Sequence, residues 1–233
     1  MIPSRPNNNW SGLRLVILDL DGVIVKIKSS WEYMHSYFGS SQNEVYNIYS
    51  RLYSSGRISY LEWMKADIEH LLRSVGRPIY RRDLDDAFSR VEFYDHSFEI
   101  LDLVRRRGAR AAIVSGGVNL MASRAARELG IRYVLSNILI FDEDERLQPG
   151  GIPQVEPLKK GYVVRKLLRS LGIEPSRAMF IGDSHWDYPA FHEVGSPVLF
   201  SDSGDDPEQL DPRVYIARDP GDLVRAVSKF LSQ

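Results

Sequence analysis

Residues 13–22, LRLVILDLDG, decide the fold of this chain. The run LRLVIL is short, mostly apolar and rich in branched side chains, and Asp19 and Asp21 follow it at once. This pattern is typical of a strand that is buried on both faces and ends in a polar turn. The same order of an apolar run and a small or polar residue recurs in residues 109–115, 131–136, 178–182 and 197–201.

Stretches with helical periodicity separate most of these strands: residues 97–107, 118–129, 157–171 and 221–232. The alternation predicts an α/β fold, a Rossmann-like parallel sheet with helices on both faces. Residues 138–149, which have an acidic tip, are predicted to form a hairpin. Ligands of such sheets bind beyond the carboxyl ends of the strands, where the polar residues fall.

Residues 28–91 interrupt the alternation, because they show helical periodicity and no convincing strand. Ser59 and Glu62 have the spacing of a capping box, which predicts a helix start at that point. We therefore expect a small helical cap domain, residues 28–91, inserted into an α/β core domain formed by residues 1–27 and 92–233.

Composition excludes several classes of protein. The 233 residues contain no cysteine, which excludes disulfides, thiolate metal sites and thiol catalysis. The formal net charge is −1, and no apolar run is long enough to span a membrane, so neither nucleic acid nor a membrane is expected as a partner. Residues 1–10 are polar and lack the apolar run of a signal peptide, so we predict a loose arm and a cytoplasmic protein. Oligomeric state is not predicted.

Two pairs of aspartates follow predicted strands. Asp19 and Asp21 point the same way if strand geometry persists, and their repulsion is tolerable if a divalent cation or a proton intervenes. Asp183 and Asp187, in IGDSHWD, have a spacing that can aim both carboxylates at one ion, with His185 between them. A simple polar turn and an N-cap are the alternative interpretations.

Two further segments could bind an anion such as a phosphate group. Ser115, Gly116 and Gly117 close a predicted strand, and small residues there let backbone N–H groups approach an anion. Lys159 and Lys160 begin a predicted helix, where a cation is electrostatically misplaced and so suggests a task such as neutralising a phosphate. Singly, a tight turn and a solvent-exposed lysine pair explain these segments as well.

The four signals together resemble the haloacid dehalogenase superfamily of phosphohydrolases, because DLDGV, VSGG, the lysine and GDSHWD occur in the order of its four motifs. The predicted helical insertion lies directly after the first motif, which is where the phosphoserine phosphatase branch of this superfamily has its cap. A lysine that precedes Gly161 and lies 23 residues before Asp183 also resembles that branch, and this spacing favours Lys160 over Lys159.

The resemblance implies a Mg²⁺-dependent phosphatase that hydrolyses a small phosphorylated metabolite. It assigns Asp19 as the nucleophile that forms an aspartyl-phosphate and Asp21 as the acid and base. It implies that Asp19, the backbone carbonyl of Asp21, and Asp183 hold Mg²⁺, with Asp187 acting through a water. The phosphoryl oxygens are expected to contact Ser115, the Gly116 N–H and Lys160.

The cap departs from the phosphoserine phosphatase pattern. Lys28 stands where those enzymes have a glutamate for the substrate ammonium, and an ungapped comparison places Asp67 where they have an arginine for the carboxylate. Both charges are reversed, so we expect poor turnover of phosphoserine and a Lys28 that contacts a second negative group of the substrate. Trp186 replaces the asparagine common in the fourth motif. Most of the many cap aromatics are expected to pack a helical bundle, and one or two to line the pocket.

Two other functions remain open. A phosphotransferase or sugar-phosphate mutase needs the same residues and differs in excluding water. A non-catalytic binding module has no need for the full set of charged residues. A dehalogenase is disfavoured, because its chemistry does not require Asp21.

Overall fold

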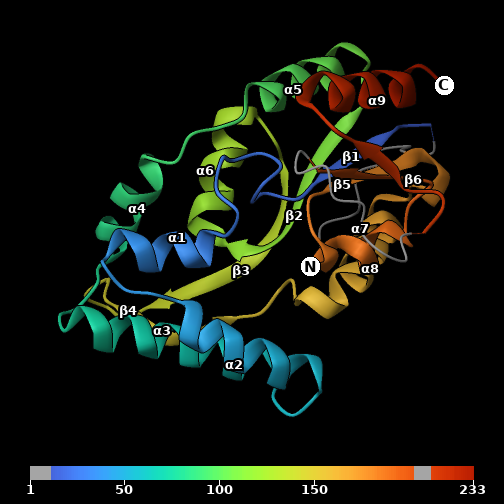
Figure 1. The fold of residues 1–233 in the computed structure, drawn as a ribbon. Helices are drawn as coiled ribbons and strands as arrows, with labels where there is room; N and C mark the ends of the chain where they lie inside the picture. The colour runs from blue at the N-terminus through green and yellow to red at the C-terminus, as the bar shows by residue number, and fades with distance from the viewer. Residues whose placement is uncertain (1–11, 202–210) are drawn as a thin grey trace, which may run out of the picture.

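A computed structural model describes residues 12–201 and 211–233, so the predicted arm, residues 1–10, lies outside it. The strands form one seven-stranded sheet in the order β4-β3-β2-β1-β5-β6-β7, parallel except for β4, which runs antiparallel to β3 (Figure 1). The strands are β1 (Leu15–Leu18), β2 (Arg110–Val118), β3 (Tyr133–Phe141), β4 (Leu147–Ile152), β5 (Ala178–Gly182), β6 (Ser196–Phe200) and β7 (Tyr215–Ala217). The predicted α/β class is confirmed.

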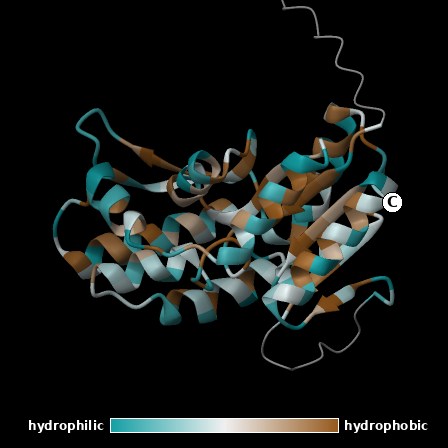
Figure 2. Ribbon diagram, turned by 90° about the horizontal axis from the view of Figure 1, so that it is seen from above, coloured by the Kyte–Doolittle hydropathy of each residue, from teal (hydrophilic) through white to brown (hydrophobic). Residues whose placement is uncertain are grey.

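The two faces of the sheet belong to separate apolar clusters, because successive strand side chains point to opposite faces. In β1, Leu15 and Ile17 pack in the cluster of α7 (Lys160–Leu171) and α8 (Tyr188–Phe191). Val16 and Leu18 pack in the cluster of α5 (Asp95–Arg106), α6 (Asn119–Leu129) and α9 (Pro220–Ser232). Figure 2 shows largely hydrophobic strands beside helices of mixed polarity. No helix formed by the described residues is long and apolar enough to span a membrane.

The segment after β1 is helical, as predicted. It forms α1 (Ser30–Tyr37), α2 (Asn43–Ser54), α3 (Tyr60–Val75) and α4 (Arg81–Ser89), which gather around the end of the sheet where β3 and β4 meet α3 (Figure 1). Buried side chains of α1 to α4 belong to the same apolar cluster as α5, α6 and α9. The division into a core and a cap domain therefore stays a prediction.

Some elements differ from the prediction. The strand expected to end at Asn137 continues to Phe141 and forms the first arm of the predicted hairpin, because Asn137 uses its side-chain amide inside the molecule instead of starting a turn. A 3₁₀ turn over Pro157–Lys159 precedes α7, so the long predicted helix has two parts. The short elements β7 and α8 were not predicted, since three or four residues give too weak a periodic signal.

The capping box at the start of α3 gives a stability prediction. The Ser59 Oγ accepts the Glu62 N–H at 3.2 Å, and a Glu62 carboxylate oxygen accepts the Ser59 N–H at 2.7 Å. Ser59→Ala should lower the free energy of unfolding in urea by about 1 kcal/mol. Ser74→Ala, an exposed position near the end of the same helix, is the control and should change it little. Equal effects of the two substitutions would show that the cap does not stabilise α3.

Candidate active site

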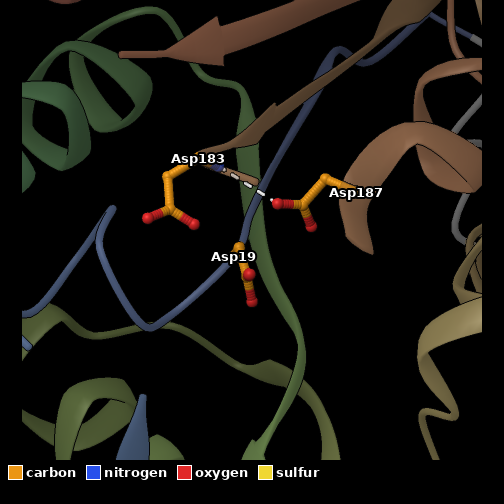
Figure 3. Close-up of side chains that lie close together, drawn as sticks. All are labelled: Asp19, Asp183 and Asp187. Carbon is orange, nitrogen blue, oxygen red and sulfur yellow. Dashed lines mark hydrogen bonds between the residues drawn. The ribbon is translucent and has the colours of Figure 1, made fainter. Parts of the chain in front are cut away.

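Three aspartates meet at the carboxyl ends of neighbouring strands. Asp19 follows β1 and Asp183 follows β5, and these strands pair in parallel register. Asp187 lies in the short turn that follows Asp183. One carboxylate oxygen from each of the three residues lies within 4.8 Å of the others, and Figure 3 shows the side chains converging on one space. The structure thus brings together three of the carboxylates that the sequence singled out.

Gly22 makes this convergence possible. Its φ is +72°, a left-handed conformation that favours glycine. A Cβ at this position would lie 1.9 Å from Oδ2 of Asp183. The glycine of DLDG is therefore needed both for the turn and for the close approach of Asp183 to the loop that follows β1.

Lys160 is the buried counter-ion of the cluster. Its side chain is 2% exposed, and its Nζ lies 3.1 Å from Asp19 Oδ2 and 2.5 Å from Asp187 Oδ1. Burial alone would lower the pKa of Lys160, but Asp187 and Asp19 raise that pKa above its ordinary value. Lys159 instead forms an exposed ion pair with Glu156. Of the two lysines, the structure thus places Lys160 in the site.

The turn after β5 is closed by Asp187. Its Oδ2 accepts the Asp183 N–H at 3.1 Å, the dashed line in Figure 3, and the Ser184 N–H at 3.2 Å. Asp187 is fully buried, while the Asp183 carboxylate stays open to the cavity and contacts Lys28 Nζ at 3.2 Å. Burial, with Asp19 and Asp187 nearby, raises the pKa of Asp183 to about 7. Such crowding of negative charge suits a site that takes up a cation.

Asp21 is held by the start of α1. Its Oδ2 accepts both the N–H and the Oγ–H of Ser30, each at 2.8 Å, while its Oδ1 is buried and has no hydrogen-bond partner among the described residues. Burial raises the pKa of Asp21 to about 7, although the Ser30 bonds oppose this shift. Sequence reasoning missed Ser30, and the available signal was the helix-start pattern of Ser29 and Glu32.

Ser115 and Gly116 lie in the last part of β2, which continues past the predicted end at residue 115, and side chains of α1 and β3 fix this stretch. Ser115 is buried, and its Oγ accepts the Gly117 N–H at 3.0 Å. The carbonyl of Gly116 accepts the Trp31 Nε1–H at 3.0 Å and the Asn137 side-chain N–H at 2.7 Å. These bonds set the orientation of the peptide that the sequence singled out as an anion contact.

Asn137 is the second residue that sequence reasoning missed. It is fully buried, and besides Gly116 it binds Val155 in both directions, donating to the carbonyl at 3.1 Å and accepting the N–H at 3.0 Å. Asn137 therefore ties the last part of β2 to the chain that leads to Lys160. Only its position in an otherwise apolar strand marked it in the sequence.

The site opens into a cavity of about 660 Å³ that extends between the strand ends and the helices α1, α2 and α3. All the predicted site residues except the fully enclosed Asp187 line it: Asp19, Asp21, Lys28, Ser115, Gly116, Lys160 and Asp183. Asp67 also lines the cavity, as the ungapped comparison predicted, and so do Trp63 and Trp186. His185 packs against Trp186, with ring centroids 4.4 Å apart and the rings inclined by 38°. It forms no hydrogen bond with the three carboxylates in the described part of the chain.

The carboxylate cluster fits a hard divalent cation. It offers only oxygen ligands, which Mg²⁺ and Ca²⁺ prefer, and one buried lysine is its only close cation other than Lys28 among the described residues. The positions of the carboxylates follow from strand ends that the sheet itself holds together. The arrangement can therefore bind a cation beside a buried carboxylate and a buried ammonium.

Comparison with known proteins agrees with this geometry. The sequence profile of the haloacid dehalogenase-like hydrolases matches residues 13–195. A phosphoserine phosphatase of Archaeoglobus fulgidus is 26% identical over 191 residues, which are 81% of this chain and 52% of that protein. A phosphoserine phosphatase of Methanocaldococcus jannaschii is 24% identical over 80% of this chain and 85% of its own length. The chain thus spans about half the length of the first relative.

Solved structures agree in fold. A phospho-aspartyl intermediate analogue of a phosphoserine phosphatase superposes with a TM-score of 0.65 at 20% identity, over 81% of this chain and 86% of that one. The similarity includes the sheet, whose strand ends carry the aspartates described above. Together with the profile match, which extends from the first strand past Asp187, it confirms the resemblance that the four motifs indicated. The chain belongs to the haloacid dehalogenase-like hydrolase family.

Proposed function

We propose that this protein is a Mg²⁺-dependent phosphatase that hydrolyses a small phosphomonoester through an aspartyl-phosphate intermediate. The observation that carries the proposal is the buried cluster of Asp19, Asp183 and Asp187, with Lys160 beside it, at the closed end of a substrate-sized cavity. A carboxylate can approach an anionic phosphate only where positive charge compensates both. The name of the relatives, phosphoserine phosphatase, supports the same reaction class.

Asp19 is the nucleophile in this proposal. Its carboxylate oxygen forms a bond to phosphorus while the bond from phosphorus to the alcohol oxygen breaks, and water then hydrolyses the acyl phosphate. The hydrogen bond from the Leu20 N–H to Oδ1, at 2.8 Å, and the contact of Lys160 with Oδ2 fix the orientation of this carboxylate before substrate binds. Fixing the attacking group in advance lowers the entropic cost of the reaction.

Asp21 is the proton donor and acceptor in this proposal. Ser30 holds Oδ2, so the unpartnered Oδ1 is the oxygen that protonates the leaving alcohol and later takes a proton from the attacking water. A pKa near 7 suits both directions of transfer, because an acid and base works best when its pKa lies close to the working pH.

Asp19, the backbone carbonyl of Asp21, and Asp183 would hold the Mg²⁺, with Asp187 acting through a water. When bound, the metal supplies positive charge that lowers the repulsion between carboxylate and phosphate. Lys160, the Ser115 hydroxyl and the Gly116 N–H are positioned to stabilise the phosphoryl oxygens as charge spreads over them.

The substrate is proposed to be a small phosphorylated metabolite in the cytoplasm. Lys28 lies at the mouth of the carboxylate cluster, with a side chain that is 64% exposed. Its role as a substrate contact stays a prediction. Asp67, in the cavity wall, places a negative charge where phosphoserine phosphatases are expected to have an arginine, so phosphoserine is a poor fit.

The nucleophile can be tested with p-nitrophenyl phosphate. Asp19→Asn should lower Mg²⁺-dependent kcat by about 10³-fold or more, since covalent catalysis and metal binding fail together, and circular dichroism should stay unchanged. Asp102→Asn, an exposed carboxylate on α5, is the matched control and should keep wild-type rates. Full wild-type activity in EDTA, or unimpaired turnover by Asp19→Asn, would contradict the proposed function.

Metal binding should be visible in thermal stability. The folded-state pKa of Asp183 is raised from 3.8 to about 7, so the metal-free folded protein binds more protons than the unfolded chain in this interval and loses stability as pH rises through it. Mg²⁺ relieves the same repulsion, so it should raise Tm more at about pH 8 than at about pH 5.

Two variants separate the ligands in that experiment. Asp183→Asn should lose most of the Mg²⁺-induced increase in Tm, whereas Asp21→Asn should keep it, because the Asp21 carboxylate is bound to Ser30 and only its carbonyl is assigned to the metal. A wild-type increase that survives intact in Asp183→Asn would show that the metal binds elsewhere.

A further inference from the structure

The far end of the cavity has a wall of three aromatic rings. Trp186, from the turn after β5, lies 6.4 Å from Trp63 on α3, and Trp63 lies 5.7 Å from Tyr46 on α2, measured between ring centroids. All three residues line the cavity. We call this group the aromatic wall. It begins one residue before Asp187 in the chain, so it is continuous with the carboxylate cluster.

The rings of the aromatic wall are not parallel. Tyr46 and Trp63 are inclined by 55°, and Trp63 and Trp186 by 57°. Flat rings of a ligand stack best between parallel faces, whereas rings inclined in this way form adjoining sides of a box. The shape therefore favours a compact, rounded group over a flat base.

A buried carboxylate adjoins the aromatic wall. Asp67 lies one helical turn after Trp63 and so on the same face of α3, and it is 2% exposed. Gln42, one turn before Tyr46, donates to Asp67 Oδ1 at 2.8 Å, and His35 Nε2 lies 3.3 Å from Oδ2. Each oxygen of Asp67 therefore already has one partner, and the burial of this carboxylate leaves little room for an N–H donor of a ligand.

The excess of negative charge in the cavity lining disfavours a substrate whose alcohol part carries a second negative group. Its lining includes five carboxylate side chains, two lysines and no arginine among the described residues. Lys160 is paired with Asp19 and Asp187, and Lys28 contacts Asp183 at the carboxylate end. The sequence predicts that Lys28 selects a second negative group, but its ammonium lies beside the predicted phosphate position and the aromatic end of the cavity carries Asp67 instead.

We propose that this end of the cavity binds the quaternary ammonium group of the substrate alcohol, so that the preferred substrate is a choline-type phosphomonoester. Faces of Trp and Tyr rings attract such cations, and Asp67 adds negative potential without a direct hydrogen bond. A quaternary ammonium has no N–H, so it does not need the occupied oxygens of Asp67. The inference rests on the proposed phosphatase function and specifies its substrate class.

The test compares phosphocholine with 3,3-dimethylbutyl phosphate. In this analogue a neutral carbon replaces the quaternary nitrogen, so the shape is kept and the positive charge is lost. We expect kcat/KM for phosphocholine to exceed that for the analogue by about tenfold or more, and also to exceed those for phosphoethanolamine, phosphoserine and adenosine monophosphate. Equal values for phosphocholine and the analogue would overturn the proposal, and so would a preference for adenosine monophosphate, which would indicate a site for flat rings.

Substitutions in the cavity test which residues favour phosphocholine over the analogue. Trp63→Leu and Asp67→Asn should each lower the ratio of kcat/KM between phosphocholine and the analogue toward one, because both remove attraction for the cation. Tyr46→Leu, at a position 38% exposed, repeats the test where substitution strains the fold least. Tyr49→Leu, on the same helix but outside the described cavity lining, is the control and should keep the wild-type ratio. An unchanged ratio in Trp63→Leu, Asp67→Asn and Tyr46→Leu would refute the assignment.

Failure of this inference is distinguishable from failure of the proposed function. Hydrolysis of p-nitrophenyl phosphate without preference for phosphocholine removes only the inference. If no ester is hydrolysed, the proposed function fails, and tryptophan fluorescence titrations of the wild-type protein with the same two esters still decide whether the cation binds at Trp63 and Trp186. Equal affinities for the two esters would then refute the inference as well.

Discussion

The ion pairs of Lys160 with Asp19 and Asp187 hold the site together. Three carboxylates within reach of one cation repel one another, and the burial of Asp19 and Asp187 makes their charges costly. Loss of one partner of a buried pair typically costs about 3–5 kcal/mol, because the remaining charge is left without compensation. Lys160 partly compensates the negative charge of the cluster, and the proposed divalent cation would compensate the rest. This constraint fixes Asp19 and Asp187, while Ser30 holds Asp21.

The helices inserted after β1 are connected to the reacting groups as well as to the cavity. The start of α1 supplies both donors to Asp21, and Trp31 from the same helix orients the Gly116 carbonyl. Gly117 permits this contact, since a Cβ there would lie 2.5 Å from Ser30 Oγ. A movement of α1 would therefore displace Asp21, the proposed acid and base, together with the stretch of β2 that is proposed to hold the phosphoryl group. If α1 moves to enclose the substrate, these contacts would also position Asp21 for the proposed proton transfer.

Much of the arrangement could be predicted from the sequence, because it depends on strand ends. The apolar runs before Asp19 and before Asp183 predicted two strands of one parallel sheet. The structure shows that these strands are neighbours and brings their carboxylates together. Ser30 and Asn137 could not be predicted as site residues. Ser30 bonds Asp21, nine residues away, and its hydroxyl also accepts the N–H of Val118, 88 residues away; Asn137 bonds Gly116, 21 residues away. None of these contacts leaves a periodic pattern in the sequence. The spacing of motifs favoured Lys160 over Lys159, and Lys160 is the lysine that contacts the carboxylates in the structure. The sequence could not show that Lys28 contacts Asp183, since that contact depends on the path of the turn after β1.

The account depends most on covalent attack by Asp19, and a trapped intermediate tests it most directly. The protein is mixed with Mg²⁺ and a phosphomonoester, quenched in acid during turnover and reduced with borohydride, which converts an aspartyl phosphate to homoserine. Peptide mass spectrometry then locates the reduced residue. The account predicts homoserine in place of Asp19 in the wild-type protein and no reduction at any carboxylate in Asp19→Asn. Release of phosphate with Asp19 never reduced, or reduction at another aspartate, would contradict it.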